Sequence, residues 1–140
     1  MSGIVRNRSA FIRNPTKIKS FLRFTAVIEG LTGISLMLVP GLVIHLLLGL
    51  SLSGPAATIT TILAGIGVSS IALICWLLRA KDATRSVMKM VLFYNGAVLF
   101  LLLYGAVIYG LNSPGLWLAS GFHFIQAVRG IRLLRFERKK

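Results

Sequence analysis

Acidic residues are scarce in this chain of 140 residues, which has three Asp and Glu against 16 Lys and Arg. Charged residues make up only 14% of the chain, whereas soluble domains carry roughly a quarter, and this excludes an ordinary water-soluble core. The single cysteine, Cys75, excludes a disulfide framework and a cysteine metal cluster. No catalytic, phosphate-binding or metal-binding motif occurs either, so we expect no enzyme activity, no cofactor and no bound metal.

What the chain has in abundance is long apolar runs, which separate the basic clusters. Four such segments cover residues 20–39, 57–78, 90–111 and 116–134. About 20 helical residues cross a hydrocarbon layer of about 30 Å, and segments without strand alternation must pair their backbone as helices there. The sequence therefore predicts an all-α, polytopic membrane protein with a four-helix bundle over residues 20–134.

The first apolar run continues past Pro40 and is too long for one upright helix. A proline disfavours the α conformation in the residue before it and suits the first turn of a new helix. We therefore predict a short helix over residues 40–48, ended by Gly49. This helix is too short to span the membrane and is expected to lie at its interface.

The basic residues predict the orientation of the chain. All 16 Lys and Arg fall within residues 1–23, 79–89 and 129–140, which lie on one side of a four-span protein. Basic loops face the cytoplasm, so both termini are expected there, with the protein in the cell inner membrane. Residues 1–19 form a basic arm and residues 135–140 a basic tail in this scheme. The net charge of +13 then reflects membrane orientation, and we expect no nucleic-acid partner.

The basic arm has two interpretations. It is either a solvated positive tail or an amphipathic segment that rests on anionic lipid head groups, to which each basic residue adds about 1 kcal/mol of attraction. The lipid bilayer, including its anionic head groups, is the expected partner in both cases.

Glu29 is the only acidic residue inside a predicted span. Counting from the basic ends places Asn95, Gln126 and Arg129 at a similar depth, so these four residues are predicted to form an intramembrane polar cluster. An ion pair between Glu29 and Arg129 is the structural interpretation. The functional alternative is a proton or cation site, because an ionisable group in a membrane is costly to keep.

The two histidines, His45 and His123, both fall toward the side opposite the basic clusters. Two histidines on facing helices can ligate a haem, and one can contact a quinone. Lone membrane histidines more often bond across a helix interface, and His45 follows the break at Pro40, so we expect structural roles.

Small residues recur every four positions on the second predicted span. The stripe consists of Ala57, Thr61, Gly65 and Ser69. Small side chains allow close helix approach in membranes, so this face is predicted to pack within the bundle or against a partner subunit or second copy.

Three sequence pieces are similar to those of a known group of proteins. They are Gly30-Leu31-Thr32-Gly33 running to Pro40 and Leu47-Leu48-Gly49, Ala64-Gly65 running to Cys75-Trp76-Leu77-Leu78-Arg79, and Tyr94-Asn95. The pattern resembles small bacterial four-helix inner-membrane proteins of unknown function, loosely DoxX-like. This resemblance implies a four-helix fold in a bacterial membrane and carries no active site.

These observations favour a small integral membrane protein without chemistry of its own, acting as an accessory, assembly or packing subunit. One alternative is a redox-chain component that binds haem or quinone near His123. Another is a small transporter that uses Glu29 as its coupling site.

Overall fold

The structure is a computed structural model and describes residues 15–79 and 84–136. The basic arm before residue 15 and the tail after residue 136 lie outside the described residues. Within the described residues the chain is all-α, with five helices and no strand, as predicted for the fold class. The helices are α1 (Pro15–Leu38), α2 (Pro40–Leu48), α3 (Pro55–Leu78), α4 (Thr84–Tyr109) and α5 (Pro114–Phe136).

Prolines and glycines set the ends of the helices. Pro40, Pro55 and Pro114 each begin a helix, where the fixed φ angle of proline is already helical and its missing N–H is not needed. Gly49 ends α2 in the left-handed conformation, with φ at 72°, and its N–H bonds to the carbonyl of His45. The short helix therefore has the bounds that the sequence predicts.

The long helices extend beyond the predicted apolar spans. Helix α1 begins at Pro15 rather than residue 20, and α4 begins at Thr84 rather than residue 90. The sequence prediction followed hydrophobicity, which ends where a membrane would end. Backbone hydrogen bonding continues past that boundary, so polar and basic turns such as the one around Lys89 remain helical.

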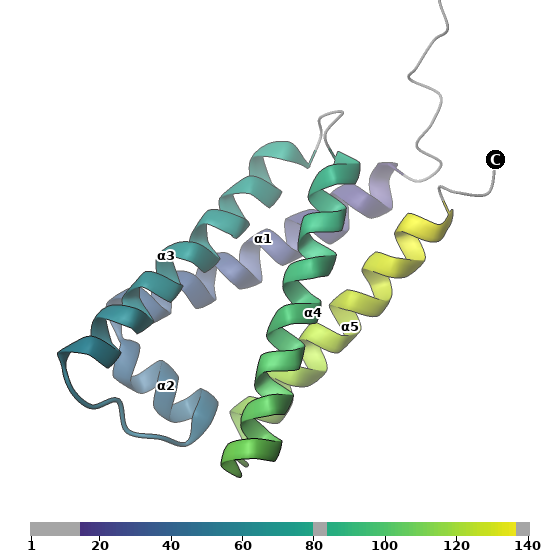
Figure 1. The fold of residues 1–140 in the computed structure, drawn as a ribbon. Coiled ribbons are helices and arrows are strands. Elements are labelled where there is room, and N and C mark those ends of the chain that lie inside the picture. Colours follow the sequence, from purple (N-terminus) through teal and green to yellow (C-terminus); the bar gives the residue numbers. More distant parts are fainter. Residues whose placement is uncertain (1–14, 80–83, 137–140) are drawn as a thin grey trace, which may run out of the picture.

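The helices associate as two pairs, α1 with α3 and α4 with α5, and α2 crosses one end (Figure 1). The opposite end collects the start of α1, the end of α3, the start of α4 and the end of α5. The described basic residues lie on these terminal turns. Charge is therefore concentrated at one end of the molecule.

Glycines bring α1 and α3 into close contact. A Cβ atom built on Gly33 meets Ser69 Oγ of α3 and lies 2.7 Å from the carbonyl oxygen of Gly65, which is closer than real Cβ atoms approach. A Cβ atom on Gly65 lies 2.7 Å from the carbonyl oxygen of Gly33. The backbones of the two helices thus meet at a point where only glycine fits.

Ser113 fixes α2 to the start of α5. Its hydroxyl donates to the carbonyl of Leu47 and accepts the N–H of Leu116 at 3.1 Å. The second bond caps the first turn of α5. A Cβ atom on the next glycine, Gly115, meets the carbonyl of Leu46, so α2 lies directly against the backbone of α5.

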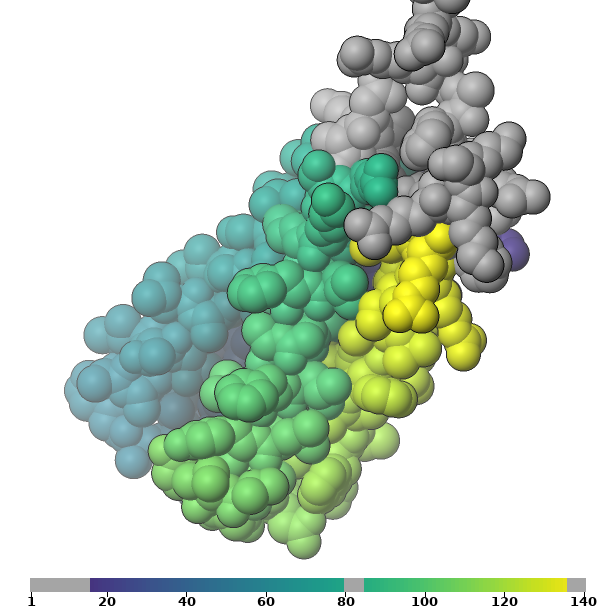
Figure 2. Space-filling view, turned by 45° about the vertical axis from the view of Figure 1, so that its right-hand side comes forward, coloured from purple at the N-terminus to yellow at the C-terminus, as the bar shows by residue number. Residues whose placement is uncertain are grey.

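The outer surface is strongly apolar. Figure 2 shows α4 and α5 along one face with α1 largely hidden behind them, and large hydrophobic side chains such as Phe93, Val107 and Leu118 are exposed on this pair. Three helices, α1, α3 and α4, are long and apolar enough to cross a membrane. Helix α5 has 23 residues but is less apolar, because it contains His123, Gln126 and three arginines.

Candidate functional site

Polar side chains from three helices meet in the interior. They are Thr25 and Glu29 of α1, Tyr94 and Asn95 of α4, and His123 and Gln126 of α5, and we call these six residues the polar cluster. Glu29 is 2% exposed, Asn95 and Gln126 1% each, and His123 8%. Three of the four residues predicted to cluster, Glu29, Asn95 and Gln126, are therefore buried on the three helices that form it.

Glu29 is held by a tyrosine rather than by an arginine. The hydroxyl of Tyr94 donates to Oε2 of Glu29 at 2.9 Å. The other carboxyl oxygen, Oε1, is buried and has no hydrogen-bond partner among the described residues. A carboxyl group with one free oxygen in an apolar interior can accept a proton or a small cation.

Asn95 links α4 to His123. Nδ1 of His123 lies 2.9 Å from Oδ1 of Asn95, so the tautomer with hydrogen on Nδ1 donates to the amide oxygen. The amide nitrogen of Asn95 donates to the carbonyl of Val91 at 2.8 Å, which fixes the orientation of the amide. The rings of Tyr94 and His123 meet edge to face with centroids 5.9 Å apart. Together these contacts hold the imidazole of His123 between α5 and α4.

Gln126 links α5 to α1 one helical turn from Glu29. Its Nε2 donates to Oγ1 of Thr25 at 2.9 Å, and the Thr25 hydroxyl donates to the carbonyl of Phe21 at 3.1 Å. Oε1 of Gln126 is buried and finds no hydrogen-bond partner within residues 15–79 and 84–136. The polar cluster therefore keeps two unpaired acceptor oxygens, on Glu29 and on Gln126.

Arg129 does not join the polar cluster, which corrects the predicted ion pair. Its side chain is exposed, and its guanidinium carbon lies 5.7 Å from the ring centre of Phe21 and 6.0 Å from that of Phe24. Gln126 is opposite Thr25, so Arg129 lies one to two turns nearer the basic end than Glu29. The sequence estimate counted depth from the ends of the spans and missed this register.

The two histidines occupy different environments. His45 is exposed on α2, whereas His123 is buried on α5 with Nδ1 bonded to Asn95. Leu46, next to His45, abuts Gly115, which is eight residues before His123, a rise of about 12 Å along the helix. The structure therefore does not bring the two imidazoles together. Within the described ranges, no group of three His, Cys, Asp or Glu side chains is placed to hold a metal ion.

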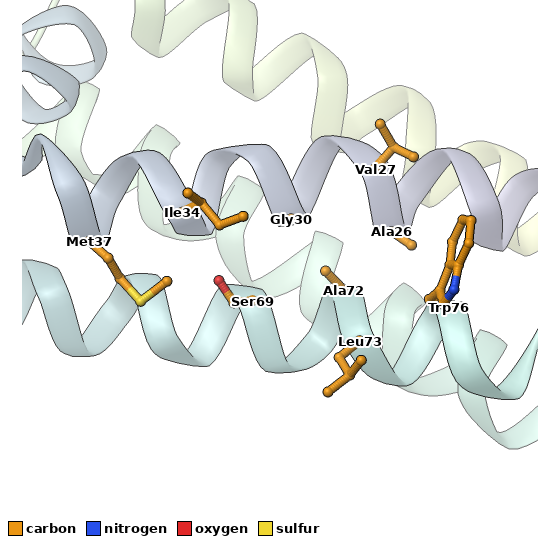
Figure 3. Close-up of a pocket in the computed structure, with 9 residues that line it drawn as sticks. All are labelled: Ala26, Val27, Gly30, Ile34, Met37, Ser69, Ala72, Leu73 and Trp76. Carbon is orange, nitrogen blue, oxygen red and sulfur yellow. The ribbon is translucent and has the colours of Figure 1, made fainter.

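An apolar groove lies between α1 and α3, and Ser69 is the one member of the small-residue stripe on α3 that lines it (Figure 3). Thr61 and Gly65 of the stripe are buried, and Ala57 and Ser69 are half-buried. The groove has a volume of about 320 Å³, and Ser69, whose Oγ is buried and has no hydrogen-bond partner in the described part of the chain, is among its lining residues. The lining residues are Ala26, Val27, Gly30, Ile34, Met37, Ser69, Ala72, Leu73 and Trp76.

Tyr94 and Thr25 are the members that the sequence prediction missed. In the sequence, Tyr94 stands out only in the piece Tyr94-Asn95 that carries the resemblance, His123 is a separate candidate, and Thr25 resembles an ordinary residue of an apolar helix. The positions of Tyr94 and Thr25 in the sequence could have indicated membership of the polar cluster. Tyr94 is adjacent to Asn95 in an apolar span, and Thr25 lies one helical turn before Glu29.

Comparisons with known proteins found no relatives for this chain: no family model, curated protein or solved structure matches it. The roles of the polar cluster and the α1–α3 groove therefore follow from their own geometry.

Proposed function

We propose that the protein is a four-helix membrane protein in which α5 is the fourth span. The supporting observation is the direction of the polar side chains of α5. Ser120, His123 and Gln126 are all buried, while Leu118, Phe124 and Ile125 are exposed. A helix that turns its polar side chains inward presents an apolar face to lipid despite a low average hydropathy.

Four spans place both termini on the side of the basic residues, which is the cytoplasmic side of a cell inner membrane by the positive-inside rule. The turns at the other end, around α2 and between α4 and α5, carry no Lys or Arg. Little of the described chain projects from the helices.

Within this architecture, we propose that the protein acts as an accessory or assembly subunit without chemistry of its own. The observation that carries this proposal is that none of the polar-cluster residues lines the α1–α3 groove. The polar groups of the interior are used mainly to join helices, whereas the α1–α3 groove is apolar and faces outward. This arrangement suits association within a membrane better than turnover of an aqueous substrate.

The expected occupant of the groove is a transmembrane helix of a partner subunit. Gly30 and Ala72 face each other across the α1–α3 interface, where a Cβ atom built on Gly30 lies 3.6 Å from the Cβ of Ala72, and these small residues leave a hollow that a large side chain of a partner helix can fill.

Photo-crosslinking in native membranes tests this proposal. In the test variant a photoreactive residue replaces Leu73, which lines the groove. In the control variant it replaces Phe93, which is exposed on α4 next to Tyr94. We expect a discrete protein adduct from position 73 and lipid adducts from position 93. Lipid adducts from both positions would reject the subunit proposal, and a self-adduct from position 73 would identify the partner as a second copy.

A second candidate function is proton or cation coupling at Glu29. The two unpaired acceptor oxygens of Glu29 and Gln126 favour it, because a proton or a cation is the species that such oxygens attract. Reconstituted vesicles test it: wild-type protein would carry a flux driven by a pH or sodium gradient, and Glu29→Gln would remove it. Equal flux in protein-free vesicles would reject this function.

A further inference from the structure

A second cavity lies between α1 and α5 at the basic end of the molecule. Its volume is about 280 Å³. We call it the basic cavity. It is lined by Lys17 and Ser20 of α1 and by Arg129, Arg132 and Leu133 of α5. Two helices that are far apart in the sequence thus bring three cationic side chains to one hollow.

No acidic side chain of the described residues balances these cations. Glu29 is the only acid in the described ranges, and it is buried in the polar cluster. Three like charges around one hollow repel one another, more strongly at a membrane boundary than in bulk water. A bound anion removes this repulsion, and a phosphate group matches the planar donor array of arginine and the point charge of lysine.

Arg129 is held in place by aromatic rings instead of by a carboxylate. Its guanidinium lies over the rings of Phe21 and Phe24 at 5.7 and 6.0 Å. This cation–π contact orients the group on the α1 side without neutralising its charge. Arg129 therefore faces the basic cavity with its positive charge still available for an anion.

Exposed apolar side chains follow the basic cavity toward the middle of α1 and α5. Phe24 lies one turn beyond Ser20 on α1, and Ile125 lies one turn from Arg129 on α5 in the same direction. Both side chains are exposed, at 45% and 56%, and the ring of Phe24 is 6.2 Å from that of Phe122. A free phosphate gains nothing from these apolar side chains, whereas the acyl chain of a lipid can pack against them.

We propose that the basic cavity binds the phosphate head group of an anionic phospholipid, with an acyl chain along Phe24 and Ile125. This inference rests on the proposal that α1 and α5 both cross the membrane with their basic ends on one side. Head-group phosphates lie at that level, and basic pockets between transmembrane helices are suited to bind them. Lys17, Arg129 and Arg132 supply the charge, and Ser20 supplies a hydroxyl donor.

Thermal unfolding of the full-length protein in mild detergent tests the proposal. The probes are phosphatidylglycerol, phosphatidylcholine with the same acyl chains, and inorganic phosphate. The test variant is Lys17→Gln with Arg132→Gln, one change on each helix, which leaves Arg129 on its rings. The control is Lys19→Gln with Arg135→Gln, which removes the same charge from exposed positions on the same terminal turns outside the cavity.

We expect phosphatidylglycerol to raise the unfolding midpoint of the wild type and the control at similar concentrations. The test variant should require at least about tenfold more lipid, because it loses two of the three cations that line the basic cavity and with them the charge-assisted hydrogen bonds that they would donate to the phosphate. Phosphatidylcholine should have little effect on any of them. The single variants Arg132→Gln and Arg135→Gln repeat the comparison with a smaller change.

Three results would overturn the proposal. Equal losses in the test and control variants mean general attraction to the basic end rather than a site. An equal midpoint shift with inorganic phosphate means a phosphate site that does not recognise lipid. An equal shift with phosphatidylcholine means no recognition of charge. A chain that stays in solution without detergent rejects the membrane proposal itself, which separates that failure from a failure of the basic cavity.

Discussion

Tyr94 of α4 donates a hydrogen bond of 2.9 Å to Glu29 of α1, and this bond connects the two helix pairs of the fold. Gln126 of α5 makes a second such connection to Thr25 of α1. Helix α1 packs its backbone against α3, and it meets α4 both through these polar side chains and through an apolar core in which its Phe21 and Leu22 are buried with Met88. The polar cluster therefore has a clear structural effect, because it joins α1–α3 to α4–α5.

Removing the Tyr94 hydroxyl is expected to loosen this connection. Tyr94→Phe leaves Glu29 without the donor to Oε2, so stability should fall by about 1–2 kcal/mol. Glu29→Gln keeps an acceptor for Tyr94 and should cost less than Glu29→Ala. Denaturation in detergent, followed by circular dichroism, measures these differences.

Tyr104→Phe is the matched control on the same helix, because Tyr104 is exposed at 42%. Equal losses from Tyr94→Phe and Tyr104→Phe would show that the bond to Glu29 adds nothing to stability. A double-mutant cycle of Tyr94→Phe with Glu29→Gln should give a coupling energy clearly different from zero.

The contact between Asn95 and His123 leads to a second prediction. Asn95→Ala adds no volume at this buried position but leaves Nδ1 of His123 without its acceptor, which should cost about 1–3 kcal/mol. Gly96→Ala, at the next position, meets no atom within 4 Å and should raise stability by about 0.5–1 kcal/mol. Thermal unfolding of both variants checks the contrast, and a loss of stability in Gly96→Ala would contradict the packing described for α4.

Much of the helix content was predictable, because long apolar runs and prolines act locally. Pro40 and Gly49 mark both ends of α2 in the sequence, and the helix has those ends. The starts of α1 and α4 were predicted too late, since hydrophobicity reports the extent of a membrane and not that of backbone hydrogen bonding.

The polar cluster was only partly predictable, because it depends on which helices are neighbours and in what register. The burial of Glu29, Asn95 and Gln126 follows from the cost of polar groups in an apolar layer. The choice of Tyr94 over Arg129 as the partner of Glu29 requires the register between α1 and α5, which composition does not contain. The pairing of α1 with α3 depends on where Gly33 meets Gly65, and several glycine faces in the sequence are equally suited to such a contact.

The close approach of α1 and α3 gives a third prediction. Gly33→Ala and Gly65→Ala each place a methyl group less than 3 Å from backbone or Cβ atoms of the facing helix, so the helices must separate. We expect each to lower stability by about 2 kcal/mol or more. Gly67→Ala, on the same helix as Gly65, meets nothing within 4 Å and should be neutral or stabilising. If all three variants unfold at the same temperature, the backbone contact between α1 and α3 is absent.

The number of membrane crossings decides where the C-terminus lies, which is the fourth prediction. If α1, α3, α4 and α5 all cross, the start of α1 and the end of α5 are on one side, together with Lys17, Lys89 and Arg135. If α5 does not cross, a tag after Lys140 lies on the side opposite to the start of α1. We expect four crossings, since the buried positions of His123 and Gln126 keep the polar side chains of α5 away from lipid.

In intact cells, a membrane-impermeant maleimide should label cysteine at exposed Ser53, between α2 and α3, and should leave a cysteine tag after Lys140 unlabelled until the cells are opened. Native Cys75 is buried and is replaced by Ser in both variants as a background control. Labelling of both the Ser53 cysteine and the C-terminal tag in sealed cells would establish three crossings and remove α5 from the membrane, and the argument from its inward polar face would then fail.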